Sequence, residues 1–579
     1  MKKNWEILQP DISITEKIQT NLKCGPVIAA ILANRNITSE ENARWFLKPS
    51  FASIKPPDSI KDIDTAVNRI YSAIINHEKI LIFGDYDVDG ITATTIFLKF
   101  LRSANADVSY YIPHRIKEGY SLQPSHIKNY AAPNKTDLII TVDCGSSSNE
   151  AVKAAQNAGI DVIITDHHEI SDKLPDAVTV VNPKRSDCES GLDYLAGVGV
   201  AFYLLICLRK YMRDKNFWQK KPEPNLKNLC DIVALGTVAD IVPLVYENRL
   251  LVKTGLEIIN SGNNCGIKAL VESSEIKNKP VDTENIAFRL APRLNAAGRI
   301  EHASIAVELL TTDNPETAKK LAVSLSNMNL KRRDIEQKTM NDIFEYLENN
   351  QCVLKNSSMV LSDNKLDKIW HEGVLGIVAS RLAKKYFRPV VIIAIKDGIG
   401  KGSARSIHGF NIYNGLASCS DHLEAFGGHE MAAGLKIKAE NMDVFQENFE
   451  NTVKQMTTLD DFVQTITIDY KLNFDDISDA LINGLEALQP FGTGNHEPLF
   501  MAENIRVANS KIVGKNHRQM VLKQSDSITE NSFKAIYFNI DINKKQPENF
   551  DKIAFRLRWN HWNGNKTAQI IIEDVKTDP

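Results

Sequence analysis

Short, fully apolar segments alternate with amphipathic segments between about residue 60 and residue 250. After a charged first residue, KILIFG, DLIITV and DVIIT consist of apolar residues and an occasional threonine, whereas ITATTIFLKFL and NEAVKAAQNAG carry apolar residues at helical spacing. Strands that are buried on both faces have continuous apolar sequences, and parallel strands need helical crossovers between them. The alternation therefore predicts an α/β fold in which helices cover both faces of a parallel sheet.

The chain has 579 residues, which is more than one hydrophobic core of about 250–300 residues can hold. The stretch from Asn314 to Asn350 contains no glycine and no internal proline, and its periodicity predicts one long connecting helix. Segments such as KIAFRLRW and TAQIIIEDV predict a β-rich C-terminal module. We expect five regions: an N-terminal helical segment (1–60) in which Thr38 caps a helix, a parallel-sheet domain (61–310), the connecting helix (311–350), a smaller α/β domain (351–460) and a separate barrel (461–579).

Composition restricts the environment and the partners of the chain. Its eight cysteines include no CxxC pair, which argues against a structural zinc site and a disulfide framework and favours a reducing, cytoplasmic location. No apolar run approaches the length of about 18 residues that a membrane span needs. The net charge of −3 gives no overall attraction to nucleic acid, so binding of a polyanion would need local basic surface and bound metal.

Acidic residues and histidines follow three of the predicted strands and the apolar stretch CDIVALGTVA. They are Asp85, Asp87, Asp89, Asp143, Asp166, His167, His168 and Asp240. A single aspartate after a strand is most often a helix N-cap. Several at the carboxyl ends of parallel strands lie at one edge of the sheet, where ligands bind, and their mutual repulsion requires a cation. The pattern predicts a metal site.

The ligand types indicate which metal and which reaction. Carboxylates bind Mg²⁺ and Mn²⁺, whereas imidazole is more frequent around transition metals, so a mixed set without thiolate favours Mn²⁺ over Mg²⁺ or Zn²⁺. The set is too large for one ion, and two neighbouring ions are typical of phosphoryl hydrolysis. We therefore expect a two-metal hydrolase of phosphate esters.

The motifs DYDVDG, VDCG, DHHE and GTVADIVPL, in this order, resemble the DHH phosphoesterase family. PRLNAAGR, HEGVLGIVASRL, KGSARS, FGGHEMAAG and FGTGNHEP narrow the resemblance to RecJ-type exonucleases. It spans about residue 80 to the C-terminus and implies a DHH catalytic domain, a DHH-associated (DHHA1) domain and an oligonucleotide-binding (OB) barrel. It also implies a single-strand-specific 5′→3′ DNA exonuclease that releases 5′ mononucleotides in DNA repair and recombination.

The resemblance assigns roles to individual residues. The implied metal ligands are Asp87, Asp89, Asp143, His167, His168 and Asp240, with Asp85 as a further metal-site acid and Asp166 as a supporting one. The residues implied to hold the 5′ phosphate and the adjacent backbone are Arg115, Arg299, Ser403 and Arg405, and His429 is implied to contact the phosphate. Outside the motifs, an isolated arginine is more often a solvated surface group and an isolated histidine a core residue.

The strand KIAFRLRW alternates apolar residues with Arg556 and Arg558, so one face can be core while the other presents cations to nucleic acid. Trp559 shares the apolar phase and is expected in the core. Trp562 could stack on a base or pack beneath the sheet, because aromatic stacking is the usual means of sequence-tolerant binding.

Two alternatives to a DNA exonuclease follow from the resemblance. The same metal core serves phosphodiesterases and nanoRNases that act on cyclic dinucleotides or short oligonucleotides, but the C-terminal module favours a polymer. Replication scaffolds that bind single strands without catalysis have lost ligands that are all present here. The expected partners are single-stranded DNA, a single-strand-binding protein and a RecQ-type helicase, with no membrane association and a monomeric state.

Overall fold

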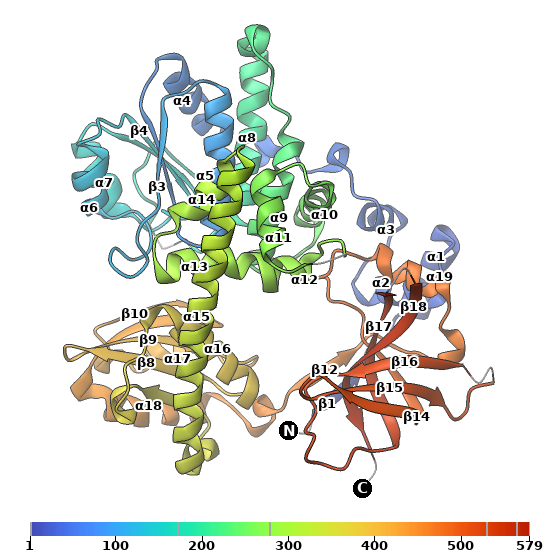
Figure 1. Ribbon diagram of the computed structural model, residues 1–579. Helices are drawn as coiled ribbons and strands as arrows, with labels where there is room; N and C mark the ends of the chain where they lie inside the picture. The colour runs from blue at the N-terminus through green and yellow to red at the C-terminus, as the bar shows by residue number, and fades with distance from the viewer. Residues whose placement is uncertain (1–2, 171–172, 277–278, 529–530, 563–564, 578–579) are drawn as a thin grey trace.

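The structure, a computed structural model, describes residues 3–170, 173–276, 279–528, 531–562 and 565–577. Figure 1 shows a large lobe with a sheet and many helices, a smaller lobe below it, and a β-rich lobe to one side. We call them the sheet lobe (α4 to α14), the second lobe (β7 to α18) and the barrel (β13 to β18). Within the described residues, no helix combines the length and the apolar character that crossing a bilayer requires.

The sheet lobe contains five parallel strands, as the sequence predicts. Their order is β3 (Val108–Tyr111), β2 (Ile80–Gly84), β4 (Leu138–Val142), β5 (Asp161–Thr165) and β6 (Thr179–Val181). Ile82 and Ile140 belong to the core on one face, and Phe83 and Ile139 belong to the core on the other. Both faces are therefore buried, which explains why the strands are apolar throughout.

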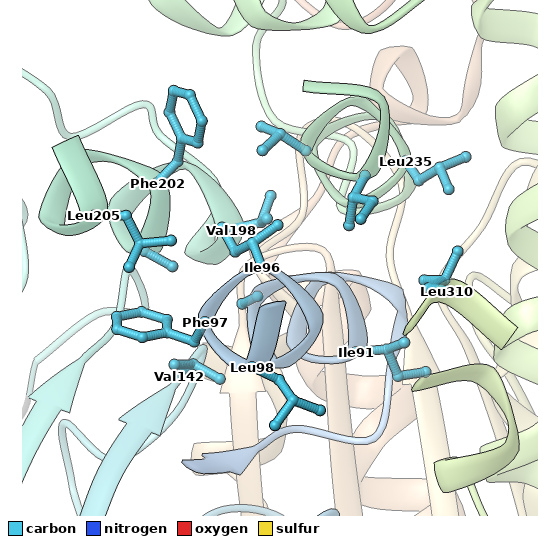
Figure 2. Close-up of a cluster of buried hydrophobic side chains, with 14 of the residues drawn as sticks. Ile91, Ile96, Phe97, Leu98, Val142, Val198, Phe202, Leu205, Leu235 and Leu310 are labelled. Atoms are coloured by element: carbon cyan, nitrogen blue, oxygen red, sulfur yellow. The ribbon is translucent and has the colours of Figure 1, made fainter. Parts of the chain in front are cut away.

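Helix α5 (Val88–Ser103) lies at the centre of the larger core. Figure 2 shows its side chains Ile91, Ile96, Phe97 and Leu98 among residues of the helices that surround it. These helices are α8 (Gly197–Asp214), α9 (Cys230–Ala239) and α14 (Ser304–Thr311). The first turn of α5 follows β2 directly, so the core fixes the position of the acidic residues there. The other helices of eight or more residues in this lobe are α4 (Ile63–Ile75), α7 (Asn149–Asn157), α10 (Tyr246–Ser261), α11 (Cys265–Ser273) and α13 (Ala291–Ile300).

The predicted connecting helix is α15 (Pro315–Asn349), whose N-cap Asn314 accepts hydrogen bonds from Glu316 and Thr317. It leaves the sheet lobe and runs along the second lobe (Figure 1). The sheet of the second lobe has the order β10 (Ala425–His429), β11 (Ala432–Lys438), β9 (Ile399–Arg405), β8 (Val390–Lys396) and β7 (Met359–Ser362). Its helices are α16 (Leu375–Tyr386), α17 (Ile412–Ala417) and α18 (Met442–Met456).

The C-terminal region forms the expected barrel. Strand β14 pairs with β15 and also with β17, which closes the ring of strands. The strands are β13 (Tyr470–Lys471), β14 (Phe500–Val513), β15 (His517–Gln524), β16 (Ser532–Tyr537), β17 (Asn549–Trp562) and β18 (Asn565–Lys576), with helix α19 (Asp479–Ala487) packed alongside. A barrel of five strands is the architecture of an OB fold.

The N-terminal segment differs from the small helical segment that the sequence predicts. Strand β1 (Asn4–Ile7) pairs with β12 (Thr465–Ile468), and helices α1 (Ile12–Leu22), α2 (Pro26–Asn34) and α3 (Glu40–Leu47) share one apolar core with the barrel. The expected cap at Thr38 is wrong. Helix α3 begins at Glu40, so Ser39 is the N-cap and its hydroxyl accepts a hydrogen bond from Asn42.

Arg249 of α10 connects the sheet lobe to these elements. Its guanidinium is fully buried and donates to the carbonyl oxygens of Phe46 (2.8 Å), Gln489 (2.7 Å) and Pro490 (3.2 Å). Its charge lies 3.8 Å from the ring centroid of Phe46. One side chain thus joins the sheet lobe, the N-terminal helices and the segment that leads into the barrel.

Candidate active site

The carboxyl ends of β2, β4 and β5 and the end of α9 bring seven of the predicted residues together. Their ligand atoms form three overlapping groups, in each of which all atoms lie within 4.8 Å of one another. The groups are Asp143 with His167 and His168, Asp89 with His167 and Asp240, and Asp85 with Asp87 and Asp143. Because Asp143 and His167 are shared, the groups form one continuous cluster.

Asp143 and His167 occupy the centre of the cluster. His167 Nε2 lies 3.1 Å from Asp143 Oδ1, 3.6 Å from Asp240 Oδ2 and 3.7 Å from Asp89 Oδ2. Asp143 has a φ of 62°, a left-handed conformation that is uncommon for a residue other than glycine and that concentrates at functional sites. The backbone turn after β4 thus aims this carboxylate at the histidine.

Backbone amides at two helix N-termini hold Asp87 and Asp89, two of the three aspartates in the DYDVDG motif. Asp87 is the N-cap of α5 and accepts hydrogen bonds from the amides of Asp89 and Gly90. The buried Asp89 accepts from the amides of Gly197 (2.6 Å) and Val198 (2.9 Å) at the start of α8. The N-cap and the metal-site interpretations are therefore both compatible with Asp87.

Asp166 has a different role from the acids around it. Its Oδ2 accepts from the amide of Ser146, and its Oδ1 accepts from the amides of His167 and His168 and lies 2.8 Å from His168 Nδ1. Although burial opposes it, the hydrogen bond and charge of His168 hold the pKa of Asp166 well below its usual range. Although burial lowers the pKa of His168, the hydrogen bond and the charge of Asp166 raise it to about 9. Asp166 thus orients His168, which fits the supporting role expected for it.

The electrostatics of the cluster require a cation. Burial and the charges of Asp89 and Asp87 raise the pKa of Asp143 well above its usual range, and burial with Asp87 raises the pKa of Asp89 to about 7. Burial and the charge of His168 lower the pKa of His167 to about 3, which leaves the ring neutral and able to bind metal. Among the described residues, Asp85 Oδ1, Asp143 Oδ1 and His167 Nε2 are buried atoms without a hydrogen bond. These donors fit Mn²⁺ or Mg²⁺.

Two further side chains border the cluster. His429, at the end of β10, has its ring 6.5 Å from that of His168 with the planes 18° apart, so the second lobe meets the sheet lobe here. The hydroxyl of Tyr120 lies 3.2 Å from His168 Nδ1 and 3.5 Å from the carbonyl oxygen of Asp143. Sequence reasoning missed Tyr120, although it belongs to the segment PHRIKEGY that contains Arg115.

Three predicted phosphate-binding residues gather at the N-terminus of α16. Arg299 Nη1 donates to the carbonyl oxygen of Gly373, just before this helix. A β-carbon at Gly376 would lie 2.8 Å from Arg405 Nη2 and 3.0 Å from Ser403 Oγ, so a larger residue here would displace these two side chains from the helix N-terminus. A helix N-terminus flanked by arginines is suited to a phosphate. We call Arg299, Ser403 and Arg405 the anchor.

The fourth predicted phosphate-binding residue, Arg115, lies over the ring of Tyr86 at 4.7 Å. Its charge reaches the anchor, because burial together with Arg115 lowers the pKa of Arg405, and burial, Arg115, Arg332 and Arg405 lower that of Arg299 to about 9. Arg115, Arg299 and Arg405 therefore form one positive region beside the metal cluster.

Arg556 and Arg558 lie apart from this region, on β17 of the barrel. Arg558 forms a two-pronged pair with Glu497 and lies 3.1 Å from Glu284 of the sheet lobe, and Arg556 lies 3.1 Å from Glu573. Trp559 is half-buried against the barrel core and donates to Asn483. The side chain of Trp562 is outside the described residues. The nucleic-acid role of both arginines stays a prediction, and contact with a phosphate would require exchange of carboxylate partners.

A cavity of about 1420 Å³ separates the sheet lobe from the barrel. It is lined by Ile241, which follows Asp240, by the exposed Phe288 of the sheet lobe, and by Arg556 and Arg558 of the barrel. The cavity thus lies between the segment that follows Asp240 and the basic strand of the barrel.

Comparison with known families gives three matches along the chain. The DHH family N-terminal domain matches residues 79–237, the DHHA1 domain matches residues 356–455, and the RecJ OB domain matches residues 468–574. These ranges fall in the sheet lobe, the second lobe and the barrel.

Similar proteins cover the chain almost completely. The single-stranded-DNA-specific exonuclease RecJ of Bacillus subtilis is 36% identical over 99% of this chain and 71% of its own length. The protein of the same name from Salmonella typhimurium is 35% identical over 99% of this chain and 100% of its own length. The crystal structure of RecJ in complex with Mn²⁺ from Thermus thermophilus superposes with a TM-score of 0.83 at 27% identity, over 100% of this chain and 80% of that one. The complex of that protein with Mg²⁺ gives a TM-score of 0.77 at 26% identity.

Proposed function

Because this chain belongs to the RecJ family of single-stranded-DNA-specific exonucleases, we propose that it removes mononucleotides from the 5′ end of single-stranded DNA, in repair and recombination. The observation that carries the proposal is the arrangement of two sites. A cluster of carboxylates and imidazoles lies at the edge of the parallel sheet, and His429 and the anchor, to which both lobes contribute residues, lie beside it. The first site suits hydrolysis and the second suits recognition of a strand end.

We propose that Asp87, Asp89, Asp143, His167, His168 and Asp240, with Asp85 beside them, hold two divalent ions, Mn²⁺ or Mg²⁺. When bound, such ions supply a water nucleophile at neutral pH and stabilise the charge that develops on the phosphate. The amides of Gly197 and Val198 keep Asp89 in place, and Asp166 keeps the ring of His168 in one orientation. These fixed contacts preorganise the ligands, which lowers the cost of reaching the reactive geometry.

Residues of the second lobe, together with Arg299 of the sheet lobe, supply the substrate contacts in this proposal. Ser403, Arg405 and Arg299 hold the terminal 5′ phosphate at the N-terminus of α16, because arginine can bind phosphate through two parallel hydrogen bonds. His429 stands over His168 and donates to the phosphate that is cut. The strand then continues through the cavity toward the barrel, whose closed ring is of the kind that binds oligonucleotides.

The alternatives are less compatible with these contacts. An enzyme for cyclic dinucleotides has no use for an end-reading anchor or for a barrel and cavity beyond the metal cluster. A scaffold without catalysis has no need of buried, mutually repelling carboxylates. We further propose cytoplasmic action with a single-strand-binding protein and a RecQ-type helicase; the eight free cysteines agree with a reducing compartment.

The experiment compares substrates and ends. Purified protein with Mn²⁺ is given end-labelled single strands, duplexes and cyclic dinucleotides, and the products are resolved by length and by label position. Release of mononucleotides from the 5′ end of single strands is expected, with little cleavage of the other two substrates. Release from the 3′ end, or faster cleavage of cyclic dinucleotides, would contradict the proposal.

The anchor is tested with Arg405→Ala and Arg299→Ala. Each variant should lower the ratio of kcat/KM between 5′-phosphorylated and 5′-hydroxyl strands, because a terminal phosphate carries charge that only such an anchor reads. Lys438→Ala, an exposed cation on the neighbouring strand β11, is the control. Ionic strength is held constant because phosphate contacts depend on salt. An unchanged ratio in both variants would remove these arginines from the end-reading pocket.

A further inference from the structure

Helix α15 carries a carboxylate that is almost completely buried. Glu336 is 1% exposed. Its Oε2 accepts a hydrogen bond from Nη1 of Arg332 at 2.7 Å, and its Oε1 lies 2.6 Å from Nε of Arg381 on α16. Arg332 also donates to Asn329 at 2.8 Å. Oε1 makes its contact with Arg381 as an ion pair and accepts no hydrogen bond from the residues that the structure describes. Because a buried charge needs a partner of opposite charge, this ion pair ties α16 of the second lobe to the connecting helix.

The two arginines that bind Glu336 lead to the two sides of the anchor. Arg381 follows Ser380, whose hydroxyl accepts from Nε of Arg405 at 3.1 Å. Arg332 is close enough to Arg299 for its charge to contribute, after burial and Arg115, to the lowered pKa of Arg299. Glu336 is therefore linked by contacts, through Arg381 and its neighbour Ser380, to Arg405 of the second lobe, and by charge alone, through Arg332, to Arg299 of the sheet lobe.

Three arginines bring positive charge to the region where the two lobes meet. Arg299 belongs to the sheet lobe and Arg405 to the second lobe, and each is partly buried near Arg115. Like charges repel more strongly where water is partly excluded. Glu336 places a negative charge between Arg332 and Arg381, at the crossing of α15 and α16.

We propose that Glu336 is a positioning residue that fixes the distance between the 5′-phosphate anchor and the metal ligands, and thereby sets how many nucleotides each cut removes. The inference rests on the function proposed above. Ser403 and Arg405 lie on the second lobe, whereas Asp143 and His168 lie on the sheet lobe. A small change in the angle between α15 and α16 moves one set relative to the other. With the terminal phosphate held, that distance decides which phosphodiester lies over the metals.

The test is Glu336→Gln, which keeps the size of the side chain but removes its charge and replaces one of the two oxygens that face Arg332 and Arg381 with an NH2 donor. Three quantities are measured with Mn²⁺: the product lengths from a 5′-phosphorylated single strand, the ratio of kcat/KM for 5′-phosphorylated and 5′-hydroxyl strands, and the hydrolysis of bis(4-nitrophenyl) phosphate. The last substrate is too small to span from the anchor to the metals. Asp334→Asn, which removes a charge from the exposed face of the same helix two residues away, is the matched control.

We expect Glu336→Gln to lower kcat/KM on the 5′-phosphorylated strand by about tenfold or more, since a misplacement of about 1 Å can cost a factor of about one hundred. The ratio between the two strand types should fall, and dinucleotides should appear beside mononucleotides. Hydrolysis of bis(4-nitrophenyl) phosphate should stay within about twofold of wild type, because the metal ligands of the sheet lobe are unchanged. Asp334→Asn should behave as wild type in all three measurements.

Two results for Glu336→Gln would overturn this inference but leave the proposed function standing. One is a wild-type ratio of kcat/KM between the two strand types with mononucleotides as the only product. The other is an equal loss on all substrates, which would indicate a general structural role. If wild-type protein itself does not prefer a 5′ phosphate, the end-reading function fails and the inference fails with it. If circular dichroism shows that Glu336→Gln does not fold, Arg381→Gln is compared in the same way. Its side chain is 53% exposed, so its replacement leaves no buried cavity.

Discussion

Replacement of Gly197 by alanine should disable the metal cluster, although the substitution leaves every proposed metal ligand in the sequence. Gly197 begins α8, and its amide donates to Asp89 at 2.6 Å. A β-carbon at this position would lie 2.4 Å from Asp143 Oδ1 and 2.8 Å from the Cβ and Cγ of Asp143. Nonbonded carbon contacts are normally about 3.5 Å or longer, so the carboxylate or the helix must move by about 1 Å.

Either movement disturbs the ligands. A displaced Asp143 leaves its position 3.1 Å from His167 Nε2, and a displaced helix lengthens the hydrogen bonds from Gly197 and Val198 to Asp89. Because a misplacement of about 1 Å can cost a factor of about one hundred in rate, we expect kcat to fall by about that factor. The affinity for single strands should change little, since the anchor and the barrel lie elsewhere.

The assay measures kcat and KM on a labelled single strand over a series of Mn²⁺ concentrations, with circular dichroism to check folding. Gly199→Ala is the matched control on the same helix. Its β-carbon would meet Leu195 Cδ2 at 3.3 Å, and a leucine side chain can rotate away. If Gly197→Ala turns over within about twofold of wild type at every Mn²⁺ concentration, close packing of α8 on Asp143 does not control the ligand geometry.

Three other predictions concern ligands, ionisation and domain packing. Asp143→Ala or His168→Ala should abolish hydrolysis while leaving single-strand binding largely intact, and Mn²⁺ should raise the Tm of wild type more than that of either variant. Near-normal turnover of either variant in excess Mn²⁺ would mean that the metal site is misplaced. Burial raises the pKa of Asp231 to about 6, so the folded state loses stability as the pH rises from about 4 to about 6. Asp231→Asn should therefore raise the Tm at pH 8 and give little gain at pH 4, and an equal gain at both would contradict this reasoning. Truncation after residue 460 should cause aggregation, because helix α2 shares its apolar core with the barrel; a monomeric truncated protein on size-exclusion chromatography that still cleaves short oligonucleotides would show that the modules are separable.

The parallel sheet and the convergence of acids at its edge were predictable because both depend on local pattern. Continuous apolar strands separated by amphipathic helices allow few arrangements, and parallel strands bring their carboxyl ends to one edge. The roles within the edge depend on finer geometry. The carboxylate of Asp166 binds backbone amides and His168, whereas the left-handed backbone of Asp143 directs its carboxylate toward His167. Spacing along the chain does not encode that difference.

Contacts between distant segments were beyond sequence reasoning. The alternation in β17 correctly placed Trp559 with the apolar residues of its strand, but it gave no sign that Arg558 would meet Glu284 of the sheet lobe, 274 positions away. The apolar helix α2 predicts burial without saying against what. Its partner is the barrel, and such pairings are decided by the global packing of surfaces and not by periodicity.

The pairing of β1 with β12 has a consequence for biosynthesis. Asn4 lies opposite Thr465, so β1 has no strand partner until the sheet lobe and the second lobe have been made. The helices that follow it must likewise wait for the barrel core. During this interval their apolar side chains are exposed, which makes them binding sites for chaperones and starting points for aggregation. Slowing translation within the segment that encodes β12 to β18 should therefore lower the yield of folded protein more than slowing it within the sheet lobe.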